Sequence, residues 1–278
     1  MFLMVLRQRL LHTGAKQSAE FKSDCNMIDF IIMGAQKSGT TAAAHNLNKH
    51  PEISIFSDVT EYGQREIEFF NQHWNRGKDW YFNQLPKEGI VGEKTAELFH
   101  RTVCHERIKM VNPNVKLVIL LRNPVDRAYS QWKMAALNKK DEVRSFEDVV
   151  MEELNQIDNR NYRDSFYQLG SRGISCWREG YLLKGFYAEQ LDNVYQLFLK
   201  EQVFVGIAEN FHQFKTESYN KIFSFLGVSP FKTVFEDKFI GQPYEPMSDK
   251  LKGILIEIYK SHNEALFHLI GYQIKQWL

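Results

Sequence analysis

The stretch "DFIIMGAQKSGTTAAAHNLNKHP", Asp29 to Pro51, decides the fold. Four apolar residues, Phe30 to Met33, lead into a glycine, and two threonines open a run of alanines and leucine at helical spacing. This order predicts a buried strand, a tight turn whose backbone amides can bind a phosphate, and a helix that ends before Pro51. The turn itself, Gly34 to Thr41, reads G-A-Q-K-S-G-T-T.

The turn departs from the loop of nucleoside triphosphatases. That loop needs a lysine directly after its second glycine, whereas this chain has Thr40 there and carries its lysine earlier, at Lys37. The helix-terminal amides and the hydroxyls of Thr40 and Thr41 can still bind an anion. Because the central strand "LVILL" ends in Arg122, where an acidic metal ligand would be expected, we expect a site for a single phosphate rather than a triphosphate, with no metal.

A second segment, "VKLVILLRNP", contains the most apolar run of the chain. Residues 115–121 have the composition of a central parallel strand, and residues 125–138 resume at helical period. Arg122 ends the strand and Ser130 lies eight residues on, inside the helix. An arginine can clamp a phosphate with two hydrogen bonds and a serine can complete the cage. The alternative is a salt-bridged Arg122 and a surface Ser130.

Strand and helix patterns alternate along the chain. Further strands are expected at 52–56 and in "EQVFVGIAENF", a strand followed by a loop, and further helices at 216–228 and 248–271. The pattern predicts an α/β fold: one domain, residues 27–278, with a central, mainly parallel sheet flanked by helices, preceded by a variable leader, 1–26. Ligands bind such sheets at the carboxyl ends of the strands, so the Gly34 and Arg122 loops can face one site.

Composition narrows the class of protein. The 278 residues are 44% hydrophobic and 14% aromatic, and the net charge of +1 gives no general attraction for nucleic acid. Cys25, Cys104 and Cys176 are odd in number and far apart, which argues against a disulfide framework or a zinc site. The apolar run before Arg7 is too short to span a bilayer. We therefore expect a cytoplasmic protein with no nucleic-acid or membrane partner; a homodimer stays open.

Taken together, the two anion-binding segments resemble the sulfotransferases that use 3′-phosphoadenosine-5′-phosphosulfate (PAPS). In that family a strand–loop–helix holds the 5′-phosphosulfate and an arginine–serine pair holds the 3′-phosphate. "REIEFFNQHWNRGKDWYFNQLP", residues 65–86, and "GEKTAELF", residues 92–99, resemble the branch that contains the heparan sulfate N- and 3-O-sulfotransferases. The resemblance covers roughly residues 28–228. It implies PAPS as donor and adenosine 3′,5′-bisphosphate (PAP) as product.

The resemblance also implies roles for individual residues. Glu66, in "EIEFF", falls on the catalytic base, Lys37 on the contact to the transferred sulfuryl group, and Lys94 on a lysine near acceptor and donor. Glu68 and Glu93 are competitors for the role of base. The donor nucleotide is implied to lie against Gln36, Lys37, Ser38, Gly39, Thr40 and Thr41, with its 3′-phosphate on Arg122 and Ser130.

Departures from the family pattern bear on the acceptor. The basic Lys-Gly-Arg segment that covers the cofactor is missing from "FIGQPYEPMSDK", with Lys238 or Lys250 as candidate substitutes, and Asn138 lies nearest the place of a branch histidine. The sequence therefore predicts a small-molecule acceptor with a hydroxyl or amine, for example a saxitoxin-type alkaloid in toxin biosynthesis, bound beside residues 162–198. The alternatives are a glycan acceptor, a metal-dependent kinase, or a nucleotide-binding protein without turnover.

Overall fold

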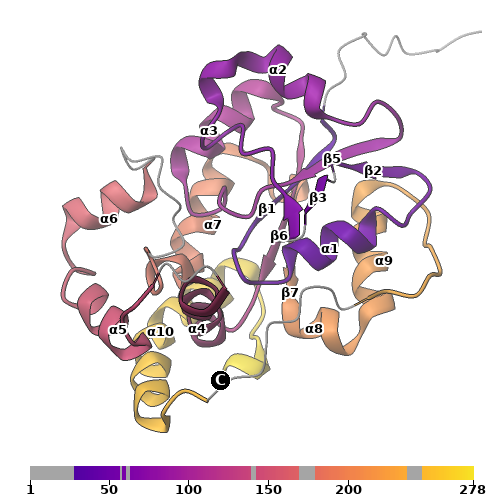
Figure 1. Cartoon of the computed structure of the whole chain (residues 1–278). Helices are drawn as coiled ribbons and strands as arrows, with labels where there is room; N and C mark the ends of the chain where they lie inside the picture. Colours follow the sequence, from indigo (N-terminus) through magenta and orange to yellow (C-terminus); the bar gives the residue numbers. More distant parts are fainter. Residues whose placement is uncertain (1–27, 57, 61–62, 139–141, 169–178, 237–245) are drawn as a thin grey trace, which may run out of the picture.

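The computed structural model describes residues 28–56, 58–60, 63–138, 142–168, 179–236 and 246–278 (Figure 1). The predicted leader, Cys25, Cys176 and Lys238 lie outside these residues. Five parallel strands form the central sheet in the order β2-β5-β1-β6-β7, which confirms the predicted α/β fold. Their bounds are β1 Phe30–Gly34, β2 Ile53–Ile55, β5 Ile90–Lys94, β6 Lys116–Leu121 and β7 Val203–Ile207.

The two central strands are buried on both faces, which explains their continuous apolar sequences. In β1, Phe30 and Ile32 pack into one hydrophobic cluster and Ile31 and Met33 into another, as side chains that alternate across a strand must. The same alternation runs along β6. Each face of the sheet therefore has its own core.

Helices cover both faces and one flank of the sheet (Figure 1). Side chains of α1 and α9 pack with Phe30 and Ile32, and those of α3, α7 and the end of α10 pack on the opposite face. Helices α4 and α5 share a third cluster with the first half of α10. The bounds are α1 Thr40–Leu47, α2 Gly77–Gln84, α3 Thr102–Val111, α4 Pro124–Lys133, α5 Phe146–Leu154, α6 Arg160–Tyr167, α7 Tyr187–Leu197, α8 Ala208–Gln213, α9 Lys215–Leu226 and α10 Asp249–Ile270.

Strand β5 was not expected as a strand, although its residues carry the "GEK" motif. It pairs with β1 on one side and β2 on the other. Gly92 lets β5 approach, because a Cβ there would come within 2.3 Å of the Phe30 ring. The structure also adds an antiparallel hairpin, β3 Asp58–Thr60 and β4 Gly63–Arg65, just before the Glu66 segment.

Three predicted elements differ in detail. The first helix ends at Leu47, before the expected 50. The expected loop after β7 is helix α8, and the single helix expected over 125–138 is α4 followed by a π-helical turn, Met134–Asn138. In the part of the chain that the structure describes, no helix combines the length and apolar character needed to cross a membrane.

Candidate active site

Three adjacent strands bring the candidate residues to one edge of the sheet. Strands β5, β1 and β6 lie side by side and run parallel, so the segments after Lys94, Gly34 and Leu121 leave the sheet in the same direction. The phosphate loop, the Lys94 segment and the Arg122 segment therefore share the carboxyl edge, the place where open α/β sheets bind ligands.

The phosphate loop has the backbone of an anion-binding turn. Lys37 and Gly39 have φ values of 70° and 84°, and α1 begins at the next residue, Thr40. Nothing lies within 4 Å of a Cβ built on Gly39, so its positive φ alone calls for glycine. A lysine in this conformation is disfavoured by roughly 1 kcal/mol or more, and such residues cluster at functional sites.

Basic side chains converge on the loop. Burial, followed by the charges of Arg122, Arg127 and Lys133, lowers the pKa of Lys37 to about 8. The Nη1 of Arg122 donates to the Lys37 carbonyl at 3.3 Å, and Tyr187 donates to the Arg122 carbonyl at 2.8 Å. An ammonium that loses affinity for its proton because of neighbouring cations marks a site where an anion would be strongly held.

Ser130 lies half-buried on α4, the helix that follows Arg122. Asn123 caps this helix by accepting from the Val125 amide at 3.0 Å, and its own amide donates to Glu209 at 2.8 Å. Within the described ranges the Ser130 side chain makes no hydrogen bond to Arg122. The structure thus places both predicted 3′-phosphate ligands on one strand–helix unit without direct contact between them.

An unsatisfied polar group supports the fit of an oxyanion in the loop. The Nε2 of Gln36 is buried and has no hydrogen-bond partner among the described residues, whereas the buried Ser38 hydroxyl interacts with that of Tyr187. Gln36 is 6% exposed. A buried donor without a partner costs about 1–3 kcal/mol, so the Gln36 amide fits a ligand that supplies acceptor oxygens.

Glu66 and Lys94 form an ion pair on the other side of the site. Lys94 Nζ lies 2.7 Å from Glu66 Oε1, and the Ala96 amide donates to the same oxygen at 3.2 Å. The Lys94 side chain is 3% exposed and that of Glu66 17%. The structure brings these two predicted residues together, and both of these hydrogen bonds fall on Oε1.

The two competitor glutamates differ sharply. Glu68 has a left-handed backbone conformation, with a φ of 54°. Burial, followed by the charges of Glu66 and Glu97, raises the pKa of Glu68 to about 7. Glu93 is fully buried and accepts from Tyr81 at 2.8 Å and Thr95 at 3.1 Å, and burial raises its pKa to about 7. Glu93 therefore belongs to the core rather than the site.

Sequence reasoning missed several buried charges at this edge. Arg127 is fully buried on α4 and donates to Gln131 at 2.8 Å and to the Tyr181 carbonyl. Glu97 and Lys184, buried and 3.3 Å apart, join the segment after β5 to a turn before α7. A lysine inside the apolar run "YLLKGFY" was the one available signal. The region 162–198, expected beside the acceptor, includes residues 169–178, which lie outside the described ranges.

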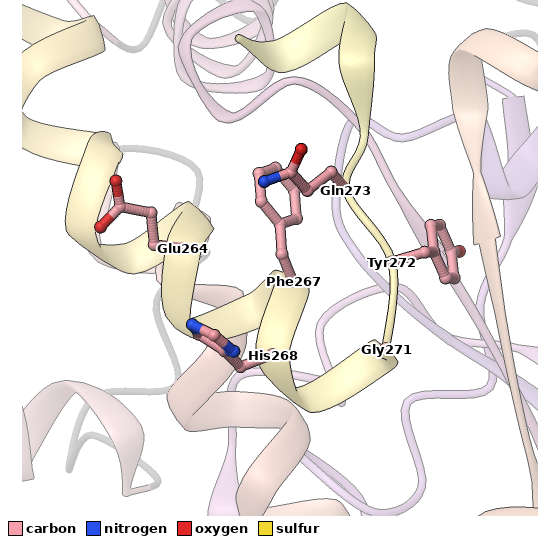
Figure 2. Close-up of a pocket in the computed structure, with 6 residues that line it drawn as sticks. All are labelled: Glu264, Phe267, His268, Gly271, Tyr272 and Gln273. Carbon is pink, nitrogen blue, oxygen red and sulfur yellow. The ribbon is translucent and has the colours of Figure 1, made fainter.

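Surface depressions do not by themselves locate the site. A depression of about 290 Å³ at the end of α10 is lined by Glu264, Phe267, His268, Gly271, Tyr272 and Gln273, none of them a candidate residue (Figure 2). A smaller cavity, about 30 Å³, does touch the phosphate loop at Ser38 and Gly39 and is closed by α8 and α9. In the described part of the chain, no group of three or more His, Cys, Asp or Glu side chains is arranged to hold a metal ion.

The family follows from comparison with known proteins. The model of the family described as "Sulfotransferase domain" matches residues 27–247. This match covers most of the chain, so the chain belongs to the sulfotransferase family. The predicted family, its heparan sulfate sulfotransferase-like branch and its fold are thereby confirmed.

Relatives and a solved structure agree with this assignment. The chain is 26% identical to the mouse (Mus musculus) bifunctional heparan sulfate N-deacetylase/N-sulfotransferase 3, over 90% of this chain and 31% of that protein. It is also 26% identical to the Dictyostelium discoideum membrane-associated sulfotransferase kil1, over 89% of this chain and 66% of that protein. The crystal structure of an Alicyclobacillus acidocaldarius sulfotransferase matches 90% of this chain and 98% of its own, with 25% identity and a TM-score of 0.69. The chain spans about a third of the length of the mouse relative.

Proposed function

We propose that the protein transfers a sulfuryl group from PAPS to a hydroxyl or amine of a small molecule. The observation that carries the proposal is the convergence of Lys37, Arg122, Arg127 and Lys133 on a loop with an unsatisfied buried amide. In the proposed reaction the S–O bond to the 5′-phosphate breaks as the acceptor oxygen or nitrogen bonds to sulfur. The acceptor proton goes to Glu66, and PAP leaves with the electron pair.

The residues divide between the two substrates. Lys37 and the amides at the start of α1 offset the charge that grows on the leaving 5′-phosphate. Arg122 and Ser130 hold the 3′-phosphate, as the family resemblance implies. Lys94 orients the Glu66 carboxylate through the 2.7 Å ion pair at Oε1, and in the proposed reaction Oε2 takes the acceptor proton. A base positioned in this way is typically worth about 10²–10⁴-fold in rate.

On the acceptor side Glu66 is paired with Lys94 and Glu97 with Lys184, so that Glu68 is the carboxyl group there without an ion pair among the described residues. Glu66, Glu68 and Glu97 lie close enough that the first and third raise the pKa of the second. Like charges repel, so this side favours a neutral or cationic small molecule over a polyanionic chain. A glycan acceptor is the second candidate, because the mouse relative described above is named as a heparan sulfate N-sulfotransferase.

Nucleotide binding tests the donor half of the proposal. PAP should raise the melting temperature, because a ligand that binds only the folded state stabilises it. Adenosine 5′-monophosphate, without the 3′-phosphate, should raise it much less, and Arg122→Ala should remove the difference. Equal shifts from the two nucleotides in the wild-type protein would contradict the Arg122 assignment.

A transfer assay tests the acceptor half. Purified protein with isotopically labelled PAPS is offered two panels, small amines and alcohols in one and heparan-type oligosaccharides in the other, with mass-spectrometric detection. Sulfation of the first panel supports the proposal; sulfation of only the second favours the glycan alternative. Transfer that survives a metal chelator distinguishes the reaction from that of a magnesium-dependent kinase. Binding of PAP without transfer to either panel would point to a protein without turnover.

A further inference from the structure

A buried three-residue cluster joins the phosphate loop to the acceptor side. Lys184 Nζ donates to Gln36 Oε1 at 3.0 Å and lies 3.3 Å from Glu97 Oε1. Gln36 comes from the phosphate loop, Glu97 from the segment after β5, and Lys184 from the turn Leu183–Gly185. All three are more than nine-tenths buried. The mechanism above gives none of these contacts a task.

The ammonium fixes the orientation of the Gln36 amide. A lysine can only donate hydrogen bonds, so the amide oxygen must face Lys184 and the nitrogen must point away. That nitrogen, Nε2, is buried with no hydrogen-bond partner among the described residues. Two N–H groups are thus held in place inside the site and remain available. The matching partner is an acceptor oxygen, and an oxyanion provides one with the greatest strength.

The position of Gln36 in the loop indicates whether its amide faces the 5′-phosphate or the transferred sulfuryl group. Ser38 to Thr41 lie at the start of α1, where helix-terminal amides would hold the phosphate that stays on the nucleotide. Gln36 lies at the other end of the loop, tied through Lys184 to Glu97 on the acceptor side. We propose that Gln36 donates to an oxygen of the sulfuryl group in transit and that Lys184 is the positioning residue that aims it. This inference rests on the proposed sulfotransferase function.

The surroundings of Lys184 hold it in place. The buried Glu153 carboxylate accepts the amides of Leu182 and Leu183, both at 3.0 Å. Gly185 approaches Tyr259 so closely that a Cβ would come within 2.7 Å of its ring. Burial and the Lys184 charge keep the pKa of His100 well below its usual range, so Glu97 has a neutral imidazole on one side and the ammonium on the other. The charge of Lys184 is therefore balanced by Glu97.

The experiment compares intact PAPS with PAP, which lacks the sulfuryl group. Calorimetry without acceptor gives both dissociation constants for wild type, Gln36→Ala, Lys184→Met and the double variant. Each single variant should weaken PAPS binding about tenfold or more, the typical effect of one hydrogen bond to a charged group, and change PAP binding less than about twofold. The double variant should bind PAPS no worse than Gln36→Ala, because Lys184 acts through Gln36.

Conservative variants keep the test decisive if Lys184→Met does not fold. Lys184→Arg, which also only donates, should retain most of the PAPS preference. Gln36→Glu keeps a partner for Lys184 but removes the N–H donors, so it should lose that preference. Additive effects in the double variant, equal weakening of PAP and PAPS, or wild-type PAPS binding by Gln36→Glu would each overturn the inference. A wild-type protein that binds neither nucleotide would instead contradict the proposed function.

Discussion

Glu66 enters the site as one half of an ion pair, and its role can be separated from that of its neighbours. Glu66→Gln keeps the side-chain size but removes the proposed base. We expect kcat to fall by about 10²-fold or more, with unchanged PAP affinity, because the carboxylate serves the acceptor. Steady-state kinetics with the acceptor found by the transfer assay measures the first quantity and calorimetry the second.

Glu68→Gln is the matched control for Glu66→Gln and should affect kcat much less. If Glu66 is the base, protonation of its carboxylate sets the acidic limb of the pH–rate profile, and Glu66→Gln should remove that limb. If Glu66 instead binds the positive charge of a cationic acceptor, Glu66→Gln will raise the acceptor KM and leave the acidic limb in place. Unaltered kcat and KM in Glu66→Gln would remove both roles and direct attention to Glu68.

The Lys37 ammonium provides a second residue-level prediction. Its pKa in the free protein is about 8, lowered by burial and neighbouring cations, and a bound bisphosphate would raise it again. PAP binding near pH 8 should therefore take up protons, and affinity should fall as pH rises above 8. Calorimetry in buffers of different ionisation enthalpy measures the uptake. Lys37→Met should bind more weakly and take up fewer protons; an unchanged uptake would assign it to another group.

At the scale of single residues, the sequence could predict those site residues that lie in short continuous segments of the chain. Lys37 and Arg122 lie inside short motifs with anion-binding chemistry, and Glu66 and Lys94 lie inside short segments that carry the family resemblance. Lys184 does not: its partners Gln36 and Glu97 lie 148 and 87 positions away, and only the packed fold brings them together. No local pattern encodes such a contact.

At the level of the elements, periodicity predicted the strands that are buried on both faces. Residues 30–34 and 116–121 form apolar runs because helices cover both sides of the sheet. Strand β5 was not predicted, because "IVGEK" ends in two charged residues whose side chains are buried. Glu93 accepts a hydrogen bond from Tyr81 in the core, and Lys94 pairs with Glu66 in the site. A strand that contains buried, paired polar residues cannot be predicted from the pattern of apolar residues alone.

Two glycines test how the elements pack. Gly92→Ala would force a Cβ to 2.3 Å from the Phe30 ring between β5 and β1, and we expect a loss of about 1–3 kcal/mol in the free energy of unfolding. Gly253→Ala, at an exposed position in the second turn of α10 with nothing within 4 Å of the added Cβ, should instead stabilise by about 0.5–1 kcal/mol. Chemical denaturation of both variants measures the difference; shifts of the same sign would contradict the described packing.

For the whole molecule, the buried carboxyl groups contribute a stability that falls as pH rises, and the buried His100 and His105 imidazoles, whose pKa values burial lowers, contribute in the opposite direction. Glu68 and Glu93 have pKa values of about 7 against 4.5 for the ordinary group, mainly because of burial. At these two groups the folded state therefore binds more protons than the unfolded state between about pH 4.5 and 7, and their contribution to stability is lost as pH rises through that window. The melting temperature of the wild type, measured relative to that of Glu68→Gln, should therefore be higher at pH 5.5 than at pH 7.5.

Glu68→Gln should remove the Glu68 contribution to this pH dependence, because an amide cannot titrate. Glu88→Gln, at a site that is exposed and shows no contact with the buried carboxyl groups, is the matched control and should leave the dependence as it is in the wild type. A Glu68→Gln protein with the full wild-type dependence would assign the effect to Glu93 alone.

Strands β1 and β6 supply the loops proposed to hold the nucleotide, whereas β5 ends in Lys94, the partner of Glu66, and the segment after it supplies Glu97 on the acceptor side. The residues proposed for nucleotide binding and those on the acceptor side therefore come from different strands at one edge of the sheet. The buried Lys184 connects the two groups. Mutations in the segment after β5 or in the Glu66 segment would change the acceptor specificity and leave nucleotide binding intact. A lineage with this architecture could change its acceptor stepwise and keep its donor throughout.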